Sequence, residues 1–224
     1  MDHDAGRLGF LDALSRLLQV ADDLDDEALL SASRCRGWTV IDVLVHIHLG
    51  LQEMLLGVVS PTAQPPDTDA ASYWRVEVLT NDPDADAVAG VRFVRALGAA
   101  YRRPVGAVAH LRPTADGITR AVAGMSPGAV ASQGRVLATG DFLATWAVEL
   151  AVHHLDLSRE LDLAPPAPSG PRLARATLES LLGGALPTAW SDEVAVLIGA
   201  GQVVPDARQA DEVGAVVQRL PVLG

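Results

Sequence analysis

The chain has 224 residues, enough for one large domain or for a domain with an appendage, and it can bury a sizeable core. Its residues are 49% hydrophobic and only 4% aromatic, which favours a helical protein packed with aliphatic side chains over a β-sandwich. The formal net charge of −11 argues against binding to nucleic acid or to an anionic membrane surface.

Several sequence features predict an intracellular protein. Cys35 is the only cysteine in the sequence, so no disulfide can form within the chain, as expected under reducing conditions. The first residues lack the basic stretch of a signal peptide, and no run of about 18 uninterrupted apolar residues predicts a membrane span. We therefore expect a cytoplasmic protein that crosses no membrane.

Helical spacing of apolar residues predicts the first two helices. Leucines recur three and four positions apart in residues 6–21, which is typical of an amphipathic helix. A second helix is predicted to start near Thr39, because Thr39 can cap the backbone and Asp42 stands three residues later, as in a capping box. This helix is expected to end at about Gly57.

The middle of the chain is expected to consist of two long connections and one helix. Residues 60–84 are rich in Pro, Asp, Thr and Ala and predict a long loop, with a short ordered piece at residues 73–79. A third helix is predicted at residues 86–102 and is broken by Pro104. The glycines and the proline of residues 112–140 predict a second long connection.

Further elements are predicted in the last third of the chain, namely a central helix at 141–161, a proline-rich linker at 165–171, a helix at 172–182, a β-prone segment at 194–198 and a last helix at 207–220. Four substantial helices with two long crossover loops predict a mainly α protein, a four-helix bundle over residues 1–163. Residues 164–224 are expected to form a small C-terminal extension.

The helix predicted at 141–161 is apolar nearly all round, yet three polar residues share one stripe on it. Glu149, His153 and Asp156 stand at positions i, i+4 and i+7. A buried carboxylate is costly unless it is paired or binds a metal. Because residues four apart lie about 5–6 Å apart at Cβ, Glu149 and His153 can reach one ion. They could equally form a buried hydrogen-bonded pair, so this pattern leaves both interpretations open.

A metal site would need a third ligand from elsewhere in the chain, and His46 is the best-placed candidate. Asp42 lies one turn earlier on the same face and is expected to orient the His46 ring. Three protein ligands leave one coordination position open, which is typical of catalytic zinc. We expect His48 on the helix surface and His154 in the core or at the surface.

Two more residues leave alternatives open. Asp156 is either an acid/base or outer-shell group one turn beyond His153 or the partner of an arginine such as Arg159. Cys35 is expected to be a small buried residue, with a thiolate activated by the following helix N-terminus as the alternative. No glycine-rich nucleotide loop follows a predicted strand, so the sequence gives no support for phosphate chemistry.

Two segments resemble a known family. Residues 37–46, Gly-Trp-Thr-Val-Ile-Asp-Val-Leu-Val-His, resemble the segment Gly-Trp-Thr-Val-x-Asp-Leu-x-x-His of the mycothiol-dependent maleylpyruvate isomerase family, which belongs to the DinB-like metalloprotein superfamily. Residues 149–157, Glu-Leu-Ala-Val-His-His-Leu-Asp-Leu, resemble its second signature, Glu-x-x-x-His followed by Asp-Leu. The resemblance covers about residues 5–162.

The resemblance implies a DinB-like four-helix bundle that holds one divalent ion, usually zinc, through His46, Glu149 and His153. It implies a low-molecular-weight thiol, mycothiol, as cosubstrate and a small-molecule electrophile as substrate of an isomerase or S-transferase, with Asp156 as a catalytic group that moves protons. A non-catalytic metal-binding or stress-response protein of the same fold is the alternative, and an interaction protein that buries a partner is a third. We expect a monomer or homodimer with no nucleic-acid partner.

Overall fold

The computed structural model describes residues 1–75 and 83–223, with the backbone alone for residues 83–87. The helices are α1 (His3–Asp22), α2 (Asp26–Leu29), α3 (Val40–Val58), η1 (Ser72–Trp74), α4 (Pro83–Ala99), α5 (Val105–Ala123), α6 (Thr139–Leu157), α7 (Ser169–Leu182), α8 (Asp192–Gly199), α9 (Ala207–Val213) and η2 (Gly214–Arg219). The strands are β1 (Pro61–Thr62), β2 (Ala129–Ser132) and β3 (Arg135–Ala138).

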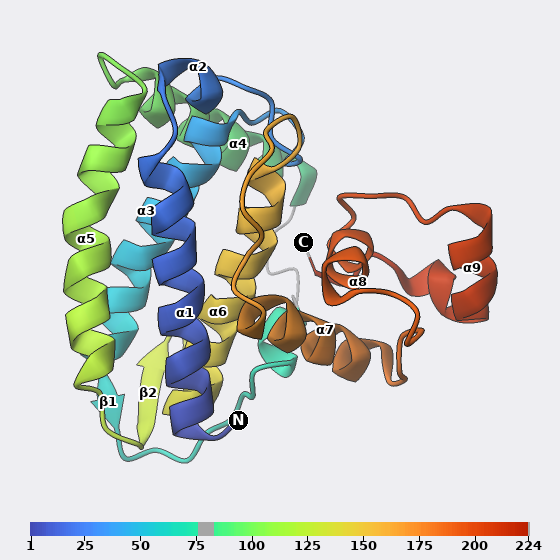
Figure 1. Ribbon diagram of the computed structural model, residues 1–224. Coiled ribbons are helices and arrows are strands. Elements are labelled where there is room, and N and C mark those ends of the chain that lie inside the picture. Colours follow the sequence, from blue (N-terminus) through green and yellow to red (C-terminus); the bar gives the residue numbers. More distant parts are fainter. Residues whose placement is uncertain (76–82, 224) are drawn as a thin grey trace.

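Four long helices form a bundle, as predicted. Helix α1 packs on α6, α6 on α3, α3 on α5 and α5 on α1, which closes the ring that Figure 1 shows. Aliphatic and aromatic side chains from all four helices fill its centre, among them Phe10, Leu44, Leu111 and Leu143. The mainly helical fold class is therefore confirmed.

The third helix of the bundle along the chain is α5, not the predicted helix at 86–102. Much of α5 falls in residues 112–140, and our prediction of a long connection there is wrong. Leu111, Ala115, Ile118 and Val122 recur at helical spacing and are buried. The burial of this stripe outweighs the helix-breaking tendency of Pro113, which lies inside α5.

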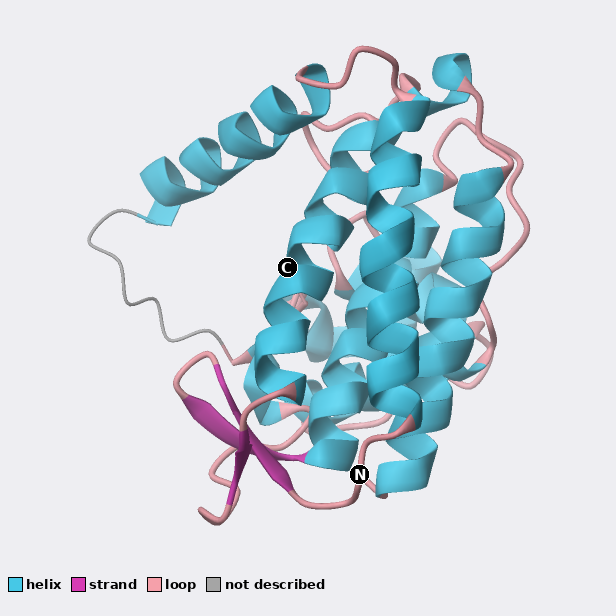
Figure 2. Ribbon diagram, turned by 90° about the vertical axis from the view of Figure 1, so that its left-hand side faces the viewer, coloured by secondary structure: helices cyan, strands magenta, loops and turns pink. Residues whose placement is uncertain are grey.

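Helix α4 corresponds to the helix predicted at 86–102, but it lies against the outside of α3. Of its described apolar side chains, Val94 is buried, whereas Val88 and Phe93 are more than half exposed. Figure 2 shows α4 leaning away from the bundle at its upper edge. The short ordered piece predicted at 73–79 begins with η1, and its residues 76–79 lie outside the described residues.

A small antiparallel sheet in the order β1-β2-β3 closes one end of the bundle (Figure 2). The hairpin between β2 and β3 turns at Gln133 (φ 51°) and Gly134 (φ 73°), with Ser132 paired to Arg135. Positive φ at both central residues matches the right-handed twist of the strands. Strand β3 leads directly into α6, so the hairpin fixes where that helix begins.

The C-terminal part packs on the outer face of α6. Val148 and Leu155 of α6 share a second hydrophobic cluster with Leu178 of α7 and Val196 of α8. In Figure 1, α7 lies across the bundle and α8 and α9 lie beside it. The boundary between residues 163 and 164 stays a prediction, because α6 contributes side chains to both clusters.

Three further elements differ from the prediction in type, continuity or length. Residues 194–198 lie in α8, not in a β-prone segment, because the Ser191 side chain caps the helix and Ala195 and Ile198 become buried on one face. The predicted last helix is divided at Gly214 (φ 57°) into α9 and η2. The central helix ends at Leu157, short of residue 161.

Helix α3 is long and apolar enough to cross a membrane by length and composition, but 61% of its most apolar window is buried inside the protein. It also begins with a capping box and carries Asp42, His46 and His48. These properties are typical of the central helix of a bundle.

The close approach of α1 to α6 predicts a stability difference between two glycine positions. A methyl group at Gly6 would overlap the carbonyl oxygen of Gly140, whereas one at Gly117 of α5 would meet no atom within 4 Å. We expect Gly6→Ala to lower the free energy of unfolding by about 1–3 kcal/mol through overpacking. The control Gly117→Ala should raise it by about 0.5–1 kcal/mol through helix propensity. Urea unfolding measures both, and a Gly6→Ala protein as stable as the wild type would contradict the packing.

Candidate metal centre

Three predicted ligands meet between α3 and α6. The Nε2 atom of His46, on α3, lies 3.1 Å from Oε1 of Glu149, and the Nε2 atom of His153 lies 3.2 Å from the same oxygen. All three atoms lie within 4.8 Å of one another. The structure therefore brings together His46, Glu149 and His153 from two distant parts of the chain.

The start of α3 sets the position of His46. Oδ2 of Asp42 accepts hydrogen bonds from the backbone N–H (2.9 Å) and the hydroxyl (2.8 Å) of Thr39, which completes the predicted capping box. The carboxylate of Asp42 thus caps the helix, and our expectation that it orients the His46 ring is wrong. The ring of Trp38 packs on that imidazole instead, with a centroid distance of 5.1 Å.

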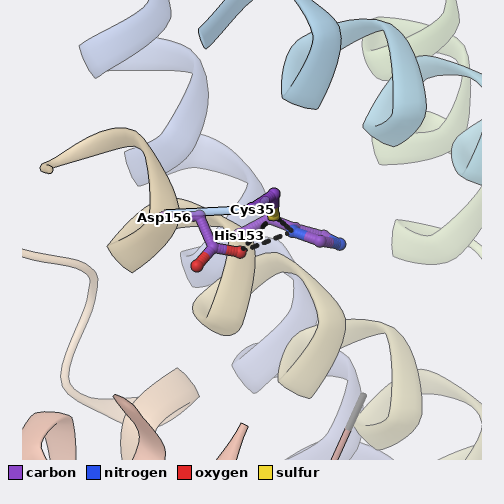
Figure 3. A group of neighbouring side chains, drawn as sticks. All are labelled: Cys35, His153 and Asp156. Atoms are coloured by element: carbon purple, nitrogen blue, oxygen red, sulfur yellow. Dashed lines mark hydrogen bonds and ion pairs between the residues drawn. The ribbon is translucent and has the colours of Figure 1, made fainter. Parts of the chain in front are cut away.

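The imidazole of His153 is held from behind by Asp156. Oδ2 of Asp156 lies 2.9 Å from Nδ1 of His153, and the Cys35 thiol donates a hydrogen bond of 3.1 Å to the same oxygen. Figure 3 shows these three side chains converging on one point. The Asp156 side chain is fully buried, and its Oδ1 atom has no hydrogen-bond partner among the described residues. This contact leaves Nε2 of His153 facing Glu149.

Hydrogen bonds hold the loop before α3 against the end of α6 and so place Cys35 beside His153 and Asp156. The backbone N–H of Arg34 donates to the carbonyl of Asp156 (3.0 Å), and its guanidinium donates to the carbonyl of Leu155 (3.2 Å). Arg159 donates to the carbonyl of Ser33 and not to Asp156, so the alternative that paired Asp156 with Arg159 is wrong. Free carbonyls at a helix C-terminus favour such arginine contacts.

Glu149 and His153, the two candidate ligands on α6, shift each other's pKa. Burial alone would raise the pKa of Glu149, but the His153 and His46 imidazoles hold it well below its usual range. Burial alone would lower the pKa of His153, but the Glu149 charge and the hydrogen bond to Asp156 raise it well above its usual value. Burial also raises the pKa of the Cys35 thiol, so Cys35 is a protonated donor and not an activated nucleophile.

The donor set fits a divalent ion. Two imidazoles and one carboxylate are ligands that zinc accepts at about 2.0–2.2 Å, which places neighbouring ligand atoms of a tetrahedral site roughly 3.4 Å apart. The two contacts to Oε1 of Glu149, 3.1 and 3.2 Å, are close to this separation. An outer carboxylate on the far nitrogen of a ligand histidine, as Asp156 provides for His153, is the usual support of such a site.

A cavity of about 170 Å³ opens on His46 and Glu149. Its walls include the aromatic rings of Tyr73, Trp74 and Trp146. Gly50 of α3 allows this arrangement, because a Cβ atom there would lie 3.0 Å from the Trp146 ring. The centre is thus accessible to a small molecule from one side.

The remaining histidines of the central helices lie elsewhere. His48 is buried, and its Nε2 atom lies 2.9 Å from the hydroxyl of Thr114 on α5, so our expectation of a surface residue is wrong. His154 is buried, as one of our two alternatives had it, and its Nε2 atom lies 2.8 Å from the carbonyl of Ala164. Sequence reasoning gave Cys35 no part in the site, since only a contact across the fold places it beside Asp156.

The fold and the site together define a helical-bundle protein with a candidate metal centre between two facing helices. The family described as mycothiol maleylpyruvate isomerase N-terminal domain matches residues 10–158, more than half of the chain. The chain belongs to this family, which confirms the resemblance found in its two sequence segments. Searches among curated proteins and among solved structures found no match.

The pKa shifts of Glu149 and His153 predict how pH affects the metal-free protein. The lowered pKa of Glu149 stabilises the fold above its usual value of 4.5, and the raised pKa of His153 stabilises it below its usual value of 6.5. The joint contribution is greatest between these values and declines as pH rises through the raised pKa of His153. A bound ion should behave oppositely, because ligand binding competes with protons.

The difference in the free energy of unfolding between wild type and Glu149→Gln isolates this effect from other titrating groups. In the presence of a chelator we expect about 1–3 kcal/mol near pH 6, the cost of leaving a buried partner unsatisfied, and a smaller difference as pH rises toward 9. With zinc added, the difference in the free energy of unfolding between wild type and Glu149→Gln should instead grow as the pH rises from about 6 toward 9. A chelated protein in which the difference also grows with pH would contradict the assignment.

Proposed function

We propose that this chain binds one divalent ion, zinc in the first place, through His46, Glu149 and His153. We further propose that it uses a low-molecular-weight thiol, mycothiol, in an isomerase or S-transferase reaction on a small electrophile. The observation that carries the proposal is the convergence of three ligand atoms beside a cavity. The family match supports the link to mycothiol and to isomerase chemistry.

The ion would supply the positive charge that favours loss of a proton from an incoming thiol, because a thiolate and not a thiol is the nucleophile. Within the described residues, the chain offers no cysteine nucleophile of its own, since the Cys35 thiol is engaged with Asp156. His46 and Glu149 border the cavity and would therefore lie on the side where thiol and electrophile meet.

Asp156 has a different role in this proposal from the proton transfer that the sequence suggested. Its side chain is fully buried behind His153, so it has no access to a molecule in the cavity. We propose that Asp156 is a positioning residue. By accepting the Nδ1–H of His153 it keeps the Nε2 lone pair available for the ion and fixes the ring.

Two observations favour an open catalytic centre over a structural ion. A structural zinc takes four protein ligands, whereas the candidate centre offers three. His48, which could have been a fourth ligand, contacts α5 instead. The cavity lies against the ligands and leaves room for an exogenous group.

Metal content tests the ligand set. The untagged wild-type protein, purified with zinc in the medium, should hold about one equivalent of zinc by elemental analysis, as expected of a mononuclear centre. His46→Ala should weaken zinc binding by more than about 100-fold, beyond the loss that follows removal of an outer-shell partner. His110→Ala replaces an exposed histidine outside the centre and should leave zinc bound. A wild type that retains no zinc, or a His46→Ala variant that retains it fully, would refute the site.

The positioning role of Asp156 is tested by Asp156→Asn, which preserves shape but removes the charge. We expect a 10- to 100-fold loss of zinc affinity, measured by competition with a chelator of known affinity. Asp162→Asn changes an exposed aspartate five residues beyond α6 and serves as the matched control. Circular dichroism of both variants checks that the fold is retained. Unchanged affinity in a folded Asp156→Asn protein would contradict the role.

A further inference from the structure

Within the part of the chain that the structure describes, no arginine lines the cavity beside the candidate metal centre. Besides its aromatic walls and its two ligands, the polar residues that line it are Glu53, Gln133 and Thr145. Among these, Glu53 bears a negative charge and the other two are neutral. The cavity is therefore aromatic and neutral to acidic.

Arg135 lies against Tyr73, one of the residues that line the cavity, and contacts the protein itself. Arg135 donates a hydrogen bond to the carbonyl of Tyr73, and its guanidinium lies 5.2 Å from the centre of the Tyr73 ring. Arg219 of the C-terminal part donates to the carbonyls of Leu181 and Leu182 at the end of α7. Arg75, which directly follows Trp74, is exposed and is not among the residues that line the cavity.

The formal charges around the candidate metal centre also disfavour an anionic substrate. The two positive charges of a divalent ion would be offset by the Glu149 carboxylate and by one thiolate. Glu53 at the cavity and Asp156 behind His153 would then add two negative charges, which the single positive charge of Arg135 on the Tyr73 ring offsets only in part. Like charges in a partly desolvated site repel more strongly than in water. Among the residues that line the cavity, a substrate with two carboxylates would meet the Glu53 carboxylate and no arginine.

From this geometry we infer that the chain acts on an uncharged electrophile that lies flat against the aromatic walls, and not on a dicarboxylate. The inference rests on the proposed function for the thiol chemistry and names the substrate class of the same site. It sets this chain apart from the substrate in the family's printed name, because maleylpyruvate carries two carboxylates. Trp146 of α6 and Tyr73 of η1 provide the apolar faces that such a molecule would contact.

Dimethyl maleate and maleate form a matched pair of probes, since they share one cis double bond and differ in charge. In the isomerisation, the thiolate sulfur forms a bond to one alkene carbon and the π electron pair moves onto the neighbouring carbonyl as an enolate. Rotation occurs about the resulting single bond. The carbon–sulfur bond then breaks, the electron pair returns to form the trans alkene, and the thiolate is released. No oxidant is consumed and no net proton is transferred.

Binding of the two probes to the full-length protein supplied with zinc tests the inference without turnover. Ligand-observed NMR titration should show the diester binding at least about tenfold more tightly than maleate, the effect of repulsion between close charges at low salt. Glu53→Gln should narrow this ratio by about threefold or more, and added salt should narrow it in the wild type. Asp12→Asn removes an exposed carboxylate of α1 and should leave the ratio unchanged.

Equal or tighter binding of maleate by the wild type would overturn the inference, as would binding of neither probe. The outcome is separable from the zinc measurement. A protein that holds zinc but prefers maleate would retain the proposed function and lose the substrate class. A protein that holds no zinc but prefers the diester would lose the metal chemistry and retain the charge preference of the cavity.

Discussion

One carboxylate oxygen connects the two central helices of this protein. Oε1 of Glu149 is approached by Nε2 of His46 from α3 and by Nε2 of His153 from α6. Removing such groups from water is costly unless they pair with one another or with an ion. In the metal-free protein a proton on His153 offsets the charge of Glu149, which is why the pKa of one falls and that of the other rises. A divalent ion would take the place of that proton between the same atoms.

The convergence of the candidate ligands was predictable because helix geometry is local. Positions 149 and 153 share a face of any helix that contains both, and the capping box ahead of Val40 fixes the phase of the helix that carries His46. The role of Asp42 was open to the same reasoning. A carboxylate at the third position of a helix that already completes a capping box is occupied by the backbone, so it is not free to orient a histidine one turn later.

The elements that sequence analysis missed depend on contacts between distant segments. Helix α5 carries glycine and an internal proline, and its stripe of buried residues becomes favourable only against α1 and α3. The same holds for α8, whose short apolar run is helical because it packs on α7. Cys35 joins His153 and Asp156 because Arg34 fastens its loop to the carbonyls at the end of α6, and no spacing along the chain encodes that contact.

The placement of α3 shows how an apolar helix acquires a defined rotation. Hydrophobic burial is non-directional, and a helix as apolar as α3 could pack in several rotations at similar cost. Polar contacts on two opposite sides remove this freedom. His46 faces Glu149 of α6, whereas His48, about 200° away around the helix axis, faces Thr114 of α5. A rotation that improved one contact would break the other and leave a buried imidazole without a partner. His48 therefore contributes to the candidate metal centre without touching it, because it fixes the direction in which His46 points.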